Sequence, residues 1–131
     1  MTGAVRGREG RLRVTVRGPH GETQKIDAVI DTGFTAFLTL PPLLIDRLHL
    51  RWRTSGRGIL ADGTERLFNI YEATVMWNRK LRSVFVSEAE TTPLIGMTLL
   101  EGYELNMQIR PGGKVTIRPL ADNAKPARRR R

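Results

Sequence analysis

Alternation of apolar and polar residues is the feature of this 131-residue sequence that most constrains its fold. In residues 11–17, RLRVTVR, the apolar residues Leu12, Val14 and Val16 occupy every second position. This period of two predicts a β-strand, because successive side chains of a strand point to opposite faces. A turn at residues 18–21 separates this strand from TQKIDAVI, a second predicted strand. Further strands are expected in residues 35–40, 66–77, 81–87 and 115–120.

Turn residues divide the chain into short segments. Thirteen glycines and seven prolines are spread along the sequence, as is typical of many short strands. In GRGILADGTERLFNI, residues 56–70, Asp62 and Gly63 predict a hairpin with a two-residue type I′ turn, which needs positive φ at both positions. Pro41 and Pro42 predict the start of a short helix, and a helical turn is expected before Gly102. We therefore expect an all-β fold with one or two short helices.

The net positive charge of the chain is concentrated in part at its C-terminal end, which bears on where the domain ends and on which partners the chain could bind. We expect one domain over residues 11–120, preceded by a flexible N-terminus over residues 1–10 and followed by a disordered basic tail over residues 121–131. The tail, ADNAKPARRRR, holds five basic residues and one acid of a chain with net charge +9. Arg128, Arg129, Arg130 and Arg131 would contact nucleic acid nonspecifically. A solubilising tail without a dedicated partner is the interpretation that we favour.

Several classes of protein are disfavoured by what the sequence lacks. Without cysteine there is no disulfide framework, thiol nucleophile or thiolate metal site, which is consistent with a cytoplasmic location. No apolar run approaches the length of a membrane span, so no membrane association is expected. No nucleophile elbow, phosphate-binding glycine loop or His-Glu-x-x-His motif is present. His20 and His49 have no spaced partner, so we expect neither a metal nor a cofactor.

One carboxylate stands between two apolar segments. In AVIDTGFTAFLTLP, residues 28–41, Asp31 follows Ile30 directly, and the chain becomes apolar again from Phe34. A carboxylate is costly to bury unless it is paired, hydrogen-bonded or protonated. Asp31 therefore either sits at a solvated turn or takes part in chemistry.

Three segments in this order resemble the retroviral-type aspartic proteases, the half-sized relatives of pepsin. They are AVIDTGFTAFLTLP, the hairpin GILADGTERLF and PLIGMTLLEGYELNMQI, within roughly residues 11–110. VTIRPL resembles an additional terminal strand of bacterial members. The resemblance implies a retropepsin-like closed β-barrel or sandwich, active as a twofold homodimer that hydrolyses peptide bonds in peptide or protein substrates.

The resemblance also implies a role for individual residues. Asp31 would be catalytic, Thr32 would hydrogen-bond across the dimer axis, and Gly33 would let the backbone pass close to the catalytic pair. Leu94, Ile95 and Gly96 would support the catalytic loop from behind, and residues 103–119 would contribute strands to the dimer interface. The flap that closes over a peptide would consist of Ile59, Leu60, Ala61, Asp62, Gly63 and Thr64. An ordinary exposed turn is the alternative for this hairpin.

Aspartic proteolysis needs two carboxylates that share one proton around a water molecule. This chain offers one suitable aspartate, so the second must come from a twin chain across a twofold axis. Pepsin-like enzymes place a hydroxyl after Asp-Thr-Gly, whereas this chain has Phe34, which predicts a less acidic pH optimum than pepsin's. Two alternatives remain at this point. One is a catalytically silent β-barrel that binds peptides or nucleic acid, and the other is an unrelated barrel in which Asp31 caps a turn.

Overall fold

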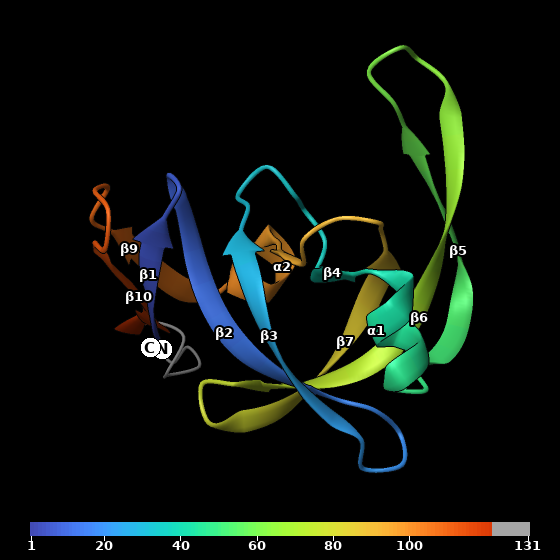
Figure 1. The fold of residues 1–131 in the computed structure, drawn as a ribbon, viewed down its shortest axis with the longest axis horizontal. Coiled ribbons are helices and arrows are strands. Elements are labelled where there is room, and N and C mark those ends of the chain that lie inside the picture. The colour runs from blue at the N-terminus through green and yellow to red at the C-terminus, as the bar shows by residue number, and fades with distance from the viewer. Residues whose placement is uncertain (122–131) are drawn as a thin grey trace, which may run out of the picture.

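Strands make up most of the structure, a computed structural model that describes residues 1–121 (Figure 1). The helices are α1 (Pro42–Arg47), which begins at the predicted proline pair, and α2 (Met97–Leu100). The strands are β1 (Thr2–Arg6), β2 (Glu9–Arg17), β3 (Thr23–Ile30), β4 (Leu38–Leu40), β5 (Arg51–Ile59), β6 (Glu65–Trp77), β7 (Lys80–Glu88), β8 (Leu94–Ile95), β9 (Tyr103–Met107) and β10 (Lys114–Pro119). The expected all-β fold with short helices is confirmed.

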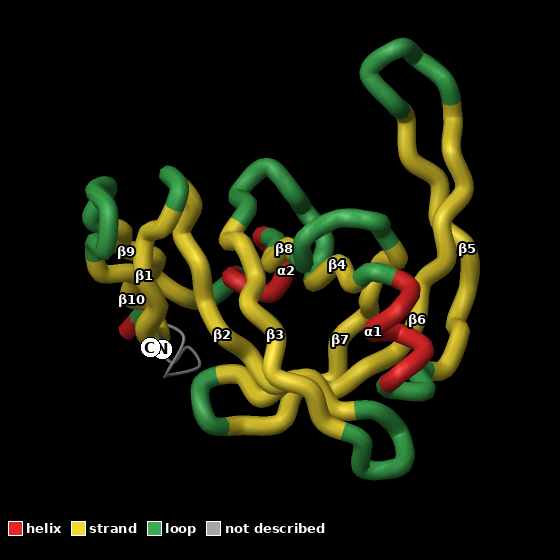
Figure 2. Tube along the Cα trace, in the orientation of Figure 1, coloured by secondary structure: helices red, strands yellow, loops and turns green. Residues whose placement is uncertain are grey.

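All ten strands belong to one sheet, in the order β5-β6-β7-β4-β8-β3-β2-β1-β10-β9. An additional pairing of β2 with β6 closes the run from β6 through β7, β4, β8 and β3 into a ring (Figure 2). Most pairs are antiparallel, but β3 pairs with β8 and β4 with β7 in parallel. The loop after β3, the loop between β7 and β8 and the tip of the β5–β6 hairpin all lie along the upper edge in Figure 2.

The core follows the predicted alternation. On β2 the side chains of Leu12, Val14 and Val16 are buried, whereas Arg13 and Arg17 are exposed. Burying one apolar side chain of this size contributes about 1.5–3 kcal/mol, so the register of the strand is strongly specified. The expected strand over residues 35–40 is shorter than predicted, because only Leu38–Leu40 pair with neighbouring strands.

The N-terminus is a strand, and the expectation of a flexible segment over residues 1–10 was wrong. β1 pairs with β2 on one side and with β10 on the other, where Thr2 lies opposite Thr116. Val5 is buried in the core. A tight turn at Gly7 and Arg8, both with positive φ, returns the chain into β2. Because its partner β10 lies at the other end of the domain, no local sequence pattern predicts that residues 2–6 form a paired strand.

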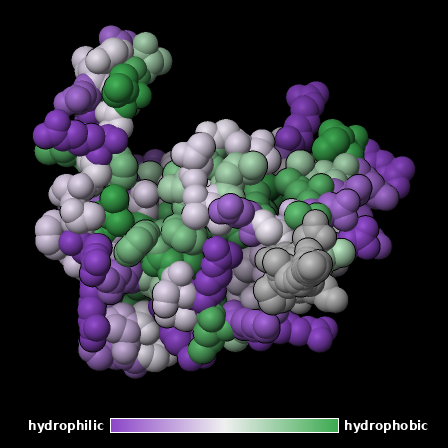
Figure 3. Space-filling view, turned by 180° about the vertical axis from the view of Figure 1, so that it is seen from behind, coloured by the Kyte–Doolittle hydropathy of each residue, from purple (hydrophilic) through white to green (hydrophobic). Residues whose placement is uncertain are grey.

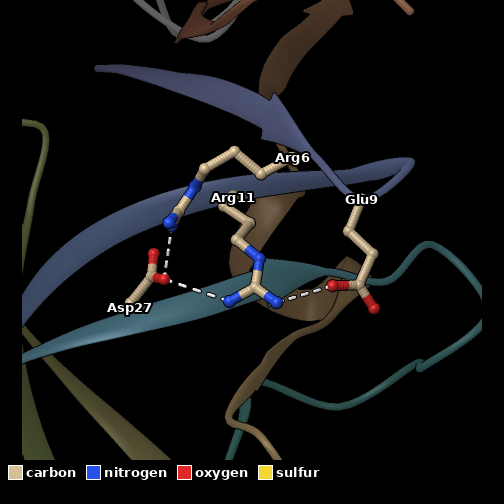
Figure 4. A network of polar contacts seen from close by, with 4 residues as sticks. All are labelled: Arg6, Glu9, Arg11 and Asp27. Carbon is tan, nitrogen blue, oxygen red and sulfur yellow. Dashed lines mark hydrogen bonds and ion pairs between the residues drawn. The ribbon is translucent and has the colours of Figure 1, made fainter. Parts of the chain in front are cut away.

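A network of ion pairs joins the first three strands (Figure 4). Asp27 on β3 accepts hydrogen bonds from Arg6 Nη2 at 2.6 Å and Arg11 Nη1 at 3.0 Å, and Arg11 Nη2 contacts Glu9 at 2.7 Å. Burial alone would raise the pKa of Asp27, but the hydrogen bonds from Arg6 and Arg11 lower it. Two of the basic residues near the start of the chain are thus engaged within the fold.

Apart from Ala121, the predicted basic tail lies outside the described residues, as do Arg128, Arg129, Arg130 and Arg131. Among residues 1–121, neither helix has the length and hydrophobicity needed to cross a membrane.

Candidate active site

Asp31 directly follows the end of β3, where the sheet holds its main chain. Val29 and Ile30 lie opposite Leu94 and Ile95 in the parallel β3–β8 pair. The pairing continues one residue further, because the Asp31 amide donates a hydrogen bond to the Ile95 carbonyl at 2.9 Å. The backbone that carries the carboxylate is therefore fixed by a strand that lies far away in the sequence.

The Asp31 side chain is half-buried and belongs to a tight turn. Its Oδ1 accepts a hydrogen bond from the Gly33 amide at 2.9 Å, and its carbonyl accepts one from the Phe34 amide at 3.1 Å. A Cβ atom at Gly33 would lie 3.3 Å from Oδ1, a tight contact that a glycine avoids. Thr32 is exposed beside Asp31. One carboxylate oxygen is thus held by the loop, which leaves Oδ2 for a ligand or a second acid.

The segment from Phe34 to Phe37 rests on β8 and α2. The Gly96 amide donates to the Phe37 carbonyl at 3.0 Å, and the Met97 amide donates to the Phe34 carbonyl at 2.8 Å. A Cβ atom at Gly96 would lie 2.1 Å from the Ala36 carbonyl oxygen, so only glycine fits this approach. Leu94, Ile95 and Gly96 therefore lie directly behind the Asp31 loop.

The predicted hairpin is present, but its turn differs from the prediction. β5 and β6 pair as far as Ile59 and Glu65. The Leu60 amide donates a hydrogen bond to the Thr64 carbonyl, and the Gly63 amide donates one to the Leu60 carbonyl, both at 2.8 Å. Of residues 60–64, only Gly63 has a positive φ. This is a three-residue loop with a glycine bulge. Asp62 Oδ1 accepts hydrogen bonds from the Thr64 hydroxyl and amide, a local turn that competes with the type I′ geometry.

The hairpin projects from the body of the molecule, as Figures 1 and 3 show, and it carries exposed apolar side chains. Ile59, Leu60 and Leu67 are 76%, 45% and 65% exposed. Isolated apolar residues on a surface are ordinary, but three on one narrow hairpin mark a contact surface.

A groove of about 740 Å³ lies between residues 66–69 of the hairpin and residues 34–36 of the Asp31 loop, and neither Asp31 nor residues 59–64 line it. This volume is within the usual range of ligand sites, roughly 300–1,000 Å³. Its walls come from three parts of the chain: Phe34, Thr35, Ala36 and Pro42; Arg66, Leu67, Phe68 and Asn69; and Ser87, Glu88, Ala89, Glu90 and Thr91.

Some of these wall residues had no signal in the sequence. Glu88 ends β7 and Glu90 lies in the loop that follows, and both line the groove. Asn69 accepts a hydrogen bond from Trp52 Nε1 at 3.1 Å and donates one to Glu88 at 3.0 Å, linking the base of the hairpin to the end of β7. The pairings of β6 with β5 and with β7 bring these side chains together.

A second hollow of about 500 Å³ begins at the other side of the Asp31 loop. Thr32 and Thr35 form its rim, and its apolar lining includes Met97, Leu100 and Leu105. Met97 is 46% exposed. Within residues 1–121, no group of three or more His, Cys, Asp or Glu side chains is arranged to bind a metal ion.

Comparison with known proteins identifies the fold. No protein-family model matches the sequence, and no curated protein sequence matches it. Among solved structures, the chain is similar to EIAV protease complexed with the inhibitor HBY-793, with a TM-score of 0.57 and 18% identity over 72% of this chain and 88% of the other. It is also similar to a retropepsin-like aspartic protease from Rickettsia conorii, with a TM-score of 0.54 and 16% identity over 92% of this chain and 91% of the other. The fold is retropepsin-like, as the resemblance predicted.

Proposed function

We propose that this chain is one half of a homodimeric aspartic endopeptidase, with Asp31 as its catalytic residue. The observation that carries the proposal is the placement of Asp31, fixed at the end of β3 on a loop whose residues 34–36 line a groove beside a projecting hairpin. The retropepsin-like fold, shared with two structures of aspartic proteases, supports the same chemistry. The absence of cysteine supports the cytoplasm as the proposed location.

The reaction requires a second copy of Asp31, and the two carboxylates would share one proton. The ionised carboxylate takes a proton from a bound water, whose oxygen attacks the scissile carbonyl carbon. The protonated carboxyl gives its proton to the carbonyl oxygen, and a tetrahedral diol forms. The carboxyl that took the proton of the water then gives it to the amide nitrogen, while the other carboxylate takes a proton from a diol hydroxyl. The carbon–nitrogen bond breaks, a carboxylic acid and an amine are released, and the pair again shares one proton. The Gly33 amide, bonded to Asp31 Oδ1, would orient the carboxylate so that Oδ2 faces its twin.

Two surfaces support association with a second copy. Thr32 is exposed next to Asp31, where its hydroxyl would hydrogen-bond across the axis. The hollow that starts at Thr32 is lined by apolar side chains and reaches β9, so residues 103–119 would contribute to the interface. The exposed Ile59, Leu60 and Leu67 suit a flap over residues 59–64 that covers an extended peptide.

Asp31→Asn tests the catalytic role. We expect this variant to lose peptide cleavage by about a thousandfold or more while it folds normally, because a neutral amide cannot act as the base. Asp46→Asn, at an exposed position of α1, is the matched control and should cleave like the wild type. The assay is mass spectrometry of a peptide library, with and without a pepstatin-like inhibitor. Cleavage that survives Asp31→Asn refutes the proposal.

Mixing the two proteins tests the shared site. A tenfold excess of Asp31→Asn protein leaves only about one wild-type chain in eleven with a wild-type partner, so activity should fall to roughly that fraction. Unchanged activity would mean that one chain suffices. If the wild type binds peptides, cuts none and behaves like Asp31→Asn, the protein is the catalytically silent binding module instead.

A further inference from the structure

A third pocket, of about 430 Å³, lies where β2 ends and β5 begins. We call it the arginine pocket. Its lining comprises Arg17, Gly18, Pro19, Phe37, Arg51, Arg53, Glu72, Ala73, Thr74, Ser83, Val84 and Phe85. None of the predicted catalytic, supporting or flap residues lines it, and Phe37 is its one residue from the loop over residues 31–37.

Strand register arranges the pocket as two neighbouring rows. In the first row, Arg17 on β2 lies opposite Thr74 on β6, which lies opposite Ser83 on β7. Directly paired residues point to the same face of a sheet, so one guanidinium and two hydroxyls share this face.

The second row lies two residues further along β6, on the same face. Arg51 on β5 lies opposite Glu72 on β6, which lies opposite Phe85 on β7. This row therefore places a second guanidinium beside an aromatic ring.

The positive charge of the pocket exceeds what its own acid neutralises. Glu72, the only acidic residue of the lining, pairs with Arg53 at 3.1 Å. Arg17 and Arg51 have no ion-pair partner among residues 1–121. Guanidinium groups bind phosphate with two parallel hydrogen bonds, and the two hydroxyls of the first row can donate to the same anion.

An aromatic surface lies beside this charge. Phe85 is 46% exposed and meets Phe37 edge to face, with 6.3 Å between the ring centroids. The Arg53 guanidinium lies over the Phe85 ring, 5.9 Å from its centroid. Aromatic rings and guanidinium planes are the surfaces on which planar bases stack. The concave shape and volume suit a small molecule better than a long polymer.

We propose that the arginine pocket binds a phosphorylated small molecule that carries a planar ring, of the size of a nucleoside monophosphate. Arg17 and Arg51 hold the phosphate, and the Phe85 and Arg53 surface takes the ring. The site is independent of Asp31, so its test needs no peptidase activity.

Calorimetric titration with AMP at physiological salt tests the proposal. The double variant Arg17→Gln/Arg51→Gln should bind AMP about tenfold more weakly or worse, because it loses both unpaired guanidiniums. Arg110→Gln, an exposed arginine in the β9–β10 turn, removes charge elsewhere and should bind like the wild type. Circular dichroism melting verifies that each variant is folded.

The ring is tested separately. Phe85→Leu keeps an apolar side chain but removes the aromatic face. It should therefore bind AMP severalfold more weakly than the wild type and bind inorganic phosphate with unchanged affinity. Inorganic phosphate should bind the wild type more weakly than AMP does. The proposal is overturned if the wild type and the double variant bind AMP with equal affinity. It is also overturned if Arg110→Gln loses as much affinity for AMP as the double variant does. The proposal is also overturned if an acidic hexapeptide competes with AMP and binds the pocket more tightly than AMP does. The pocket would then be a site for acidic polypeptides.

Discussion

Replacing Gly96 with alanine measures how tightly β8 supports the Asp31 loop. The backbone at Gly96 has φ −105° and ψ 177°, which alanine adopts without strain, so the cost comes only from the space that the methyl group needs. The new Cβ would lie 2.1 Å from the Ala36 carbonyl oxygen and 2.8 Å from that of Phe34. Contacts below 3.0 Å are essentially never observed, so the loop must retreat by about 0.9 Å.

That retreat acts on two hydrogen bonds. The bonds from the Gly96 amide to Phe37 and from the Met97 amide to Phe34 are 3.0 and 2.8 Å long, and lengthening both by that amount breaks them. Two lost bonds at about 1 kcal/mol each, with about 1–2 kcal/mol of overpacking strain, predict a loss of about 3–4 kcal/mol in the free energy of unfolding. If the proposed peptidase activity is present, displacing Asp31 should also lower kcat about a hundredfold.

Urea denaturation of the wild type, Gly96→Ala and Gly58→Ala measures this cost. At Gly58 in the hairpin, a Cβ would have ordinary contact with Phe68 at 3.6 Å, so this control should match the wild type within about 0.5–1 kcal/mol. A free energy of unfolding for Gly96→Ala within about 0.5 kcal/mol of the wild type would refute the reasoning. The steric contact would then be relieved without strain on the loop.

Two further predictions concern pH. Burial alone would raise the pKa of Glu22, but hydrogen bonds from its own amide, the His20 amide and the rings of His49 and His20 lower it to about 2. Because the folded-state pKa is below the ordinary value of 4.5, the stability that ionised Glu22 contributes is present above pH 4.5 and lost as the pH falls toward 2. Melting temperatures between pH 2.5 and 6 should therefore vary less in Glu22→Gln than in the wild type, and parallel curves would contradict this. Phe34→Ser places a hydroxyl after the Asp-Thr-Gly triplet, so the pH–rate profile of cleavage should shift toward acid; a profile that does not move would remove Phe34 as the cause of a less acidic optimum.

The sequence revealed those parts of the fold whose causes are local. Alternation over residues 11–17 and 23–30 predicted β2 and β3, because a strand with one buried face must alternate. The proline pair marked the start of α1, since proline suits the first turn of a helix. The order of the segments around Asp31 and Gly96 predicted the retropepsin-like fold.

Features that depend on distant residues were missed or misjudged. The sequence predicts a flexible segment where β1 lies, because the partner strand β10 is at the far end of the domain. The sequence predicts a type I′ turn at the hairpin tip, but the hydrogen bonds from the Thr64 amide and hydroxyl to Asp62 favour a longer loop. The wall positions of Glu88 and Asn69 depend on the pairing of β6 with β7, and the arginine pocket depends on three strands in register.

The parallel pairing of β3 with β8 has a consequence for a chain that is still being synthesised. A ribosome delivers Asp31 early, but the Ile95 carbonyl that holds its amide emerges only after β7 is complete. Contacts between distant residues also form slowly, since closing a long loop costs entropy before the contact is made. A nascent polypeptide therefore carries the acidic residue without its support, and the geometry of the loop arises only when nearly the whole domain has left the ribosome.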